Sequence, residues 1–340
     1  MCIYETEKQS SAWLSALLLV GAAAWAMANY IPAVGKLVGG PVFAILLGMI
    51  LAFWKRPSGM DAGITFCSKK ILQYSIIFIG FGMNIRTVLA AGEQSLAVML
   101  CTIAASLLTA LLMGRVLKVP SNTATLIGVG TSICGGSAIA ATAPVIDADD
   151  REVAYSISTI FLFNILAVFL FPALGRILHM TDTGFGIWAG TAINDTSSVV
   201  AAGFAFSDAA GGLATIVKLT RTLMIIPITL ALTLYRTWKR KRQGTAAAAS
   251  YSIVKIFPWF VLGFLLTAIV NSTGWISPAA SDWLNGLGKF GIMIAMAGIG
   301  LNTNLKSLVK NGVRPITLGL CCWFVVAVVS LVVQHLLHLA

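Results

Sequence analysis

Charged residues are scarce in this sequence. They make up 10% of its 340 residues, whereas hydrophobic residues make up 58%; a soluble domain carries about 25% charged residues. A water-soluble fold has too little interior to bury so much apolar surface, which excludes an ordinary soluble domain. Apolar runs long enough to cross a hydrocarbon layer of ~30 Å recur along most of the chain. The sequence therefore predicts one all-α polytopic membrane domain over residues 1–340, with the lipid bilayer as its surroundings.

Acidic residues are fewer than basic ones, with 12 Asp and Glu against 23 Lys and Arg and a net charge of +11. The basic residues are scattered among short loops instead of gathering with aromatic residues on one face, which argues against nucleic acid as a partner. If every apolar segment crosses the membrane, one set of loops holds most of the Lys and Arg residues, and the other holds only Lys36, Arg86 and Arg151. By the positive-inside rule, this asymmetry predicts a multi-pass protein of the bacterial inner membrane with a cytoplasmic N-terminus.

Motifs for nucleotide, metal or redox chemistry are absent. The sequence has no Walker-type phosphate-binding loop, and its 6 cysteines show neither CxxC nor Cys/His spacing. An intramembrane enzyme would need a nucleophile with a base, paired carboxylates or a metal cluster. The candidate nucleophiles Ser132, Ser197 and Cys134 have no histidine within their own apolar segments. We therefore expect a protein that is not an enzyme and that holds neither a metal nor an organic cofactor.

The hydropathy pattern predicts about eleven transmembrane segments. They lie at residues 13–31, 39–54, 70–84, 95–117, 122–146, 153–178, 184–206, 211–236, 253–271, 284–301 and 315–338. Internal similarity relates two parts of the chain, 39–178 and 184–338, and a basic cytoplasmic loop is predicted at 236–252.

This similarity indicates inverted repeats. The matching pairs are 79–88 (IGFGMNIRTV) with 297–308 (AGIGLNTNLKSL), and 41–52 with 258–270. Seven crossings separate the partners in the predicted topology, so the two copies run in opposite directions, as in many secondary transporters. Asn84 and Asn302 occupy equivalent places in the repeat. They are expected either to line a transport pathway or to cap helices.

Two polar stretches interrupt the fifth and seventh segments, GTSICGGSAIAA (130–141) and GTAINDTSSVVAA (190–202). Such backbone has low helix propensity, and its freed amide and carbonyl groups need partners inside a membrane. We therefore predict that both segments are discontinuous or re-entrant, although close packing through small residues is an alternative explanation. The candidate substrate- or ion-binding residues are Thr131, Ser132, Gly135, Gly136, Ser137, Asn194, Asp195, Thr196 and Ser197.

Ionisable side chains are rare within the apolar segments. Asp195 is the only carboxylate deep in one of them, and it is expected to serve binding or coupling, or to form a structural salt bridge. Lys218 and Arg221 share a helix face through their i, i+3 spacing. They are expected to face the interior and meet Asp195, a bound anion or both, unless they extend to an interface. Asn164 is expected to bond across helices without touching substrate.

The ordered stretches 130–146, 190–203 and 216–227 resemble the YeiH-type family of bacterial membrane proteins, for which sulfate export has been proposed. The match covers nearly the whole chain after the first segment, although many members of that family carry histidine where this chain has Asn194. A more distant similarity, through GFGMN and the Cys-Gly-Gly-Ser stretch, joins it to the bile-acid/sodium symporter and cation-proton antiporter superfamily. The resemblance implies crossed discontinuous helices packed on a panel domain and transport by alternating access.

These observations favour a secondary transporter that exports sulfate or a related small anion, with H⁺ or Na⁺ as the coupling ion. An Na⁺/H⁺ or other cation-proton antiporter centred on Asp195 is the principal alternative. A passive channel and an intramembrane enzyme are the remaining possibilities, and the sequence is also compatible with a homodimer.

Overall fold

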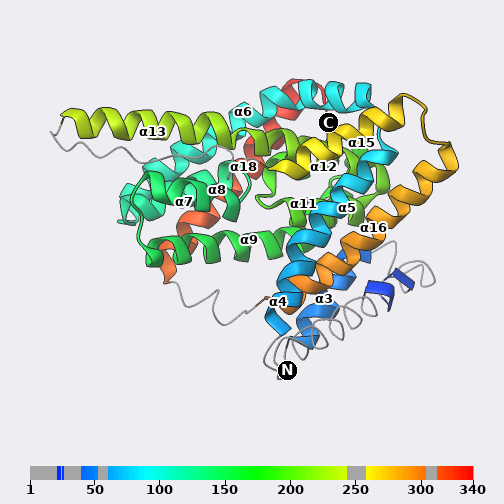
Figure 1. Cartoon of the computed structure of the whole chain (residues 1–340). Coiled ribbons are helices and arrows are strands. Elements are labelled where there is room, and N and C mark those ends of the chain that lie inside the picture. The colour runs from blue at the N-terminus through cyan, green and yellow to red at the C-terminus, as the bar shows by residue number, and fades with distance from the viewer. Residues whose placement is uncertain are drawn as a thin grey trace.

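The computed structural model describes residues 21–23, 25–26, 40–52, 60–242, 258–303 and 312–339, and every regular element in these ranges is helical. Figure 1 shows them as α3 (Gly40–Leu51), α4 (Met60–Phe66), η1 (Cys67–Ile71), α5 (Leu72–Ile79), η2 (Gly80–Gly82), α6 (Ile85–Val116), α7 (Ser121–Ser132), α8 (Gly136–Thr142), η3 (Ala143–Val145), α9 (Asp150–Ile177), α10 (Asp182–Ala192), α11 (Thr196–Phe206), α12 (Asp208–Leu223), α13 (Ile225–Arg242), α15 (Trp259–Ser272), α16 (Pro278–Leu301) and α18 (Val313–Leu336). The all-α prediction is therefore confirmed for the described part of the chain.

Six helices in the described ranges are long and apolar enough to span a membrane. They are Gly63–Gly82, Ile85–Val116, Asp150–Ile177, Asp208–Leu234, Pro278–Leu301 and Val313–Leu336. The predicted count of eleven is thus not confirmed. The fifth and seventh segments are each split into shorter helices, the second and ninth appear as the short apolar helices α3 and α15, and the first lies almost wholly outside the described residues.

Short polar residues set where several helices begin. Asp149 and Glu152 form a capping box on α9, in which the Glu152 amide donates to Asp149 Oδ1 at 2.7 Å. Ser207 caps α12 by accepting from the Ala210 amide at 3.0 Å, and Thr181 caps α10 in the same way. These contacts satisfy amides that have no partner within the helix.

The backbone of α13 stays helical through the basic run and ends at Arg242, so the predicted loop starting at 236 begins several residues too early. Lys and Arg have high helix propensity, and positive charge near a helix C-terminus interacts favourably with the carbonyl end. In Figure 1, this helix extends away from the rest of the molecule.

Helices α3, α5, α15 and α16 pack on one another, and we call them the panel group. They lie on the right-hand side of the molecule in Figure 1. Glycines permit the close crossings: a Cβ added at Gly288 of α16 would lie 2.8 Å from the carbonyl oxygen of Ser75 in α5. Small residues at membrane-helix interfaces allow this backbone approach.

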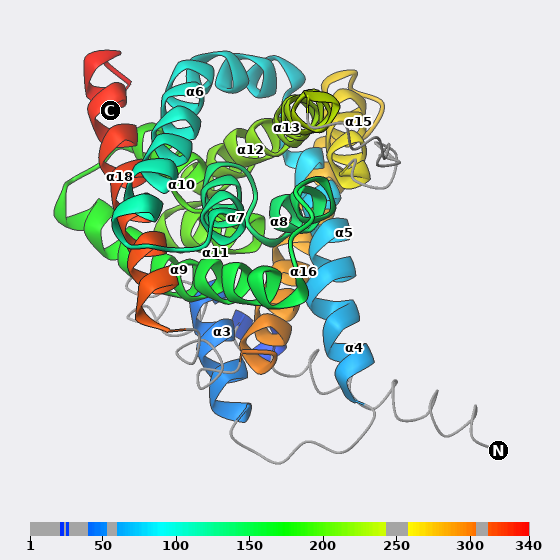
Figure 2. The same ribbon diagram turned by 90° about the vertical axis from the view of Figure 1, so that its left-hand side faces the viewer.

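Helices α6, α7, α9, α10, α11, α12 and α18 form a second set of packed helices, which we call the core group. Helix α12 packs along both α10 and α11, and Figure 2 shows these three helices together with α7 and α8 in the middle of the molecule. The two groups meet where α11 packs on α3 and α16. This arrangement places the two interrupted segments and α12 side by side.

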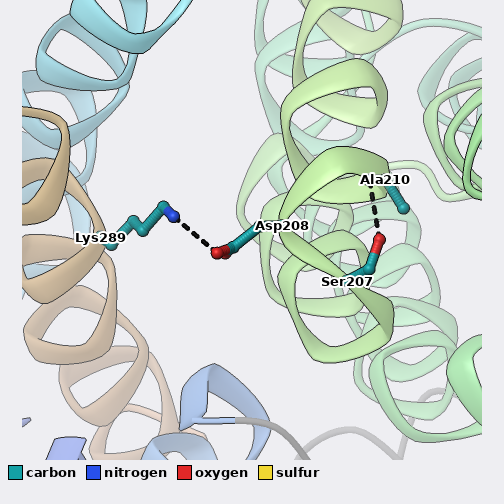
Figure 3. Close-up of polar contacts among 4 residues, drawn as sticks. All are labelled: Ser207, Asp208, Ala210 and Lys289. Carbon is teal, nitrogen blue, oxygen red and sulfur yellow. Dashed lines mark hydrogen bonds and ion pairs between the residues drawn. The ribbon is translucent and has the colours of Figure 1, made fainter. Parts of the chain in front are cut away.

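An ion pair also links the groups. Lys289 Nζ of α16 lies 2.8 Å from Asp208 Oδ2 at the start of α12, beside the Ser207 cap (Figure 3). The two side chains are 36% and 73% exposed. A pair this accessible contributes no more than about 1 kcal/mol. Lys289 therefore offers a peripheral cation with which the buried cations described below can be compared.

The contact between α10 and α12 depends on a glycine. A Cβ added at Gly190 would lie 2.7 Å from Val217 Cβ and 2.9 Å from the Ala214 carbonyl oxygen. We expect Gly190→Ala to destabilise the protein by about 1–3 kcal/mol, because the backbones would have to separate. A lower melting temperature in detergent would show this.

The matched control is Gly286→Ala in α16, where an added Cβ would meet nothing within 4 Å. That substitution should leave stability unchanged or raise it by about 0.5–1 kcal/mol, since alanine restricts the unfolded chain and favours helix. Equal melting temperatures for the two variants would contradict the tight contact at Gly190.

Candidate functional site

Both polar stretches interrupt helices in the structure. Helix α7 ends at Ser132 and α8 begins at Gly136, while α10 ends at Ala192 and α11 begins at Thr196. The prediction that both segments are discontinuous is therefore confirmed. Each break leaves main-chain carbonyl groups at the end of the first helix without helical partners.

Gly135 makes the sharp turn in the first break. Its φ of 70° and ψ of −125° are accessible to glycine but strained for other residues. A Cβ at this position would also lie 3.3 Å from Ile160 and 3.7 Å from both Asn164 and Asp195. The glycine therefore brings the first break close to the second.

Lys218 of α12 joins the two breaks. Its ammonium donates to the carbonyl oxygen of Ile133 at 2.7 Å and to that of Ile193 at 3.1 Å. The residue is fully buried. One positive charge thus bridges the carbonyl ends of α7 and α10.

Arg221, one turn further along α12, completes the arrangement. Its guanidinium donates to the carbonyl oxygens of Thr131 at 2.6 Å, Ser132 at 2.7 Å and Thr191 at 2.5 Å. It is also fully buried, and its planar fork is suited to several fixed acceptors. Lys218 and Arg221 together therefore satisfy carbonyls at the ends of both helices.

These contacts correct one prediction and confirm another. The two cations face the interior as expected, and neither extends to an interface. They do not pair with Asp195, which was one of the partners expected for them: within the described chain, neither cation has a carboxylate within 4.0 Å. The backbone carbonyl groups freed at the two breaks accept the hydrogen bonds of the cations instead. Every residue has such a carbonyl group, so the sequence does not indicate which ones would be the acceptors.

Asp195 instead caps α11. Its Oδ2 accepts from the Ser197 amide at 2.9 Å and from the Ser197 hydroxyl. A carboxylate suits this position because the amide end of a helix carries partial positive charge. The side chain of Asp195 is partly exposed, whereas Thr196 and Ser197 are 9% and 7% exposed. This carboxylate is therefore the most accessible charge of the two breaks.

Asn164 of α9 forms a hydrogen bond between this helix and the second break. Its Oδ1 accepts from the main-chain amide of Asp195 at 3.2 Å. The side chain also lies next to Gly135 in the first break. The prediction that Asn164 bonds across helices is confirmed. The bond holds the main chain of Asp195, which is the residue that caps α11.

Two buried polar side chains at the breaks have no hydrogen-bond partner among the described residues. Asn194 is 1% exposed, and both its amide nitrogen and its oxygen are unpaired; the hydroxyl of Thr131, which is fully buried, is unpaired as well. Leaving such groups unsatisfied costs about 1–3 kcal/mol each. Unpaired polar groups beside an interrupted helix are therefore candidate ligand contacts.

A polar contact from α18 was not predicted. The hydroxyl of Thr191 lies 2.7 Å from that of Ser330, which accepts from Gln334 Nε2 at 3.1 Å. Ser330 and Gln334 are fully buried and occur four residues apart in an apolar helix. The four-residue spacing of Ser330 and Gln334 could have predicted this contact, because polar residues on one face of an apolar helix indicate a partner helix.

Four other predicted site residues do not bond to the buried cations in the described chain. Ser137 is exposed on α8, and Gly136 is partly exposed. Asn84 is exposed and caps α6 by accepting from the Arg86 amide at 2.9 Å, which confirms the capping alternative. Asn302 is the exposed C-terminal cap residue of α16. Neither asparagine bonds to a residue of the breaks in the described chain.

The polar groups at the breaks leave an excess of positive charge. The two carbonyl ends carry partial negative charge, and the amide ends of α8 and α11 carry comparable partial positive charge, so these contributions oppose each other. Lys218 and Arg221 contribute +2 and Asp195 contributes −1, which leaves a formal charge of +1 among the three side chains. A buried charge of this kind is stabilised by an additional negative group.

The fold and the site define a multi-helix membrane protein with two interrupted helices held together by buried cations. The sequence profile of a family described as conserved hypothetical protein 698 matches residues 13–319. UPF0324 membrane proteins of Streptococcus mutans and Fusobacterium nucleatum are 50% and 45% identical over 329 and 340 aligned residues. The alignments cover 94% of this chain and 95% and 96% of those relatives. The chain belongs to the UPF0324 family, which is the YeiH-type family that the sequence motifs resemble.

Proposed function

We propose that this protein is a secondary active transporter that exports a small oxyanion such as sulfate across the bacterial inner membrane. The observation that carries the proposal is the pair of fully buried cations, Lys218 and Arg221, placed where two helices are interrupted, with one nearby carboxylate, Asp195. Interrupted helices that present their ends inside a membrane bundle are typical of transporter substrate sites.

The proposed anion site lies at the start of α11. The amide end of this helix carries partial positive charge, and the unpaired side-chain amide of Asn194 adds donors. The neighbouring Thr131 hydroxyl is also unpaired. An oxyanion accepts several hydrogen bonds at once, so it would satisfy these donors and balance the excess charge.

Alternating access is the proposed mode of transport. The core group and the panel group meet chiefly through α11, so a relative movement of the two groups would change access to the breaks from the two sides. The inverted repeats, the cytoplasmic N-terminus and the inner-membrane location are parts of the same proposal. They are supported by the internal sequence similarity and by the distribution of basic loops.

The competing antiporter hypothesis places a transported cation at Asp195. In the structure, Oδ2 of Asp195 is engaged by Ser197, and the carbonyls near it accept from Lys218 and Arg221. A cation would add to the positive charge already present there, which opposes its binding. We therefore favour the anion, and the experiment below separates the two hypotheses.

Sulfate should stabilise the purified wild-type protein. A ligand that binds only the folded state contributes about 2.7 kcal/mol when its concentration is 100 times its dissociation constant. We expect the melting temperature to rise with sulfate at constant ionic strength and constant sodium. Uptake of radiolabelled sulfate into proteoliposomes under an imposed pH gradient would then measure transport.

Chloride, phosphate and an organic dianion at equal ionic strength are the matched controls for the anion. Sodium varied at constant chloride is the control for the antiporter hypothesis. Stabilisation by sodium alone, with no response to any anion, would reject the anion proposal in favour of a cation antiporter.

A further inference from the structure

Five of the main-chain carbonyl groups at the two breaks accept hydrogen bonds from Lys218 or Arg221. Three are at the end of α7, on Thr131, Ser132 and Ile133, and two are at the end of α10, on Thr191 and Ile193. Carbonyls at the C-terminal end of a half-helix carry partial negative charge and, in transporters with broken helices, coordinate a coupling cation. In this chain, the carbonyl groups at the two breaks instead bind the side-chain cations of Lys218 and Arg221.

We propose that Lys218 is a tethered replacement for a free monovalent cation, assisted by Arg221, and that the two breaks bind no metal cation during transport. The Lys218 ammonium is a compact single charge with one contact to each break, 2.7 Å to Ile133 and 3.1 Å to Ile193. It therefore joins the carbonyl ends of α7 and α10 as a bound cation would.

Covalent attachment to α12 has a consequence for coupling. A free cation is taken up on one side of the membrane and released on the other, so its gradient can drive transport. The Lys218 ammonium stays with the protein through the whole cycle, and it is fully buried. The gradient of the anion or of protons must then drive transport. Because this inference concerns the same two breaks, its coupling part rests on the transport function proposed above.

The decisive variant is Lys218→Ala. It removes three methylene groups and the ammonium, and it leaves the carbonyls of Ile133 and Ile193 without this donor. n-Propylammonium replaces the lost atoms. We expect n-propylammonium, and to a smaller extent sodium, to raise the melting temperature of Lys218→Ala by on the order of 5 °C at saturating concentration. The wild type should respond to neither ion.

Lys218→Met is the matched control. Its apolar side chain fills the space of the lysine stem, so an added cation cannot enter, and no rescue is expected. Lys289→Ala removes the exposed cation of α16 and should also show no rescue. Neutral 1-propanol tests whether rescue comes from the positive charge of n-propylammonium or only from filling the cavity left by the lysine. It should not stabilise Lys218→Ala.

Two results would overturn the proposal. One is stabilisation of the wild type by sodium, or sulfate flux that requires sodium, because either would show a free cation site in the native protein. The other is a folded Lys218→Ala protein that is indifferent to both n-propylammonium and sodium. If Lys218→Ala cannot be purified even with n-propylammonium present, the wild-type sodium measurements decide. These melting temperatures are measured without any anion substrate, so they can fail or succeed independently of sulfate transport.

Discussion

Arg221→Met is expected to cause the largest loss of stability of any single substitution at the breaks. The guanidinium holds carbonyls of Thr131, Ser132 and Thr191 from two different helices. Methionine replaces the aliphatic part of the arginine side chain but donates nothing, so these buried acceptors would lose their partner. Removing one partner from a buried charged network costs about 3–5 kcal/mol, because the groups left behind remain desolvated. A fall in melting temperature, or loss of folded protein during purification in detergent, would show the effect.

Arg221→Lys tests the geometry of this interaction. It preserves the charge, but a single ammonium cannot reproduce the planar fork that reaches three acceptors. We therefore expect partial loss of stability, between wild type and Arg221→Met. Lys289→Ala, which removes an exposed cation, should cost no more than about 1 kcal/mol. A melting temperature for Arg221→Met equal to that of Lys289→Ala would show that the carbonyl contacts do not stabilise the fold.

Substitutions at Asp195 are expected to separate its charge from its capping role. Asparagine also caps helices well, so Asp195→Asn should retain the contact with the Ser197 amide and leave stability nearly unchanged. The negative charge would be lost, and with it any coupling of transport to protons. We expect sulfate flux to fall by at least about tenfold, which corresponds to about 1.4 kcal/mol on the barrier.

Asp195→Ala removes both the charge and the cap. Its flux should fall as far as that of Asp195→Asn, and its free energy of unfolding should drop by a further ~1 kcal/mol through loss of the N-cap. Thermal stability and proteoliposome flux measured on the same preparations would separate the two effects. Normal flux in Asp195→Asn would show that the carboxylate serves the structure of α11 and has no part in coupling.

Much of the membrane character of this protein is readable in its sequence. Apolar periodicity predicts the long helices such as Ile85–Val116 and Val313–Leu336, because a hydrocarbon environment permits few alternatives to helix. The interruptions are also predictable, since Gly135 and the polar run beginning at Asn194 lower helix propensity where the chain is otherwise apolar. The number of spans was predicted less well, because hydropathy alone does not distinguish a helix that spans a membrane from two shorter halves.

The partners of the ionisable residues were harder to predict. Opposite charges suggested a salt bridge between Asp195 and the cations, yet Asp195 caps its own helix and the cations bond to carbonyls. Asn84 and Asn302 looked equivalent in the repeat, but each is an exposed cap residue at a helix end and bonds to no residue of the breaks in the described chain. In each case the competing partner was a main-chain group, which every residue possesses and no sequence pattern marks.

The sequence alone predicts that this chain belongs in a membrane, that it is helical, that two of its segments are interrupted and that Lys218 and Arg221 face the interior unless they extend to an interface. The structure shows that both cations are buried. The groups that those two cations contact follow from how distant helices pack together. The acceptors exist because α7 and α10 stop, and they converge because α12 packs beside both breaks. Carbonyls left over at a helix end become a site for positive charge only when a distant part of the chain is brought to them.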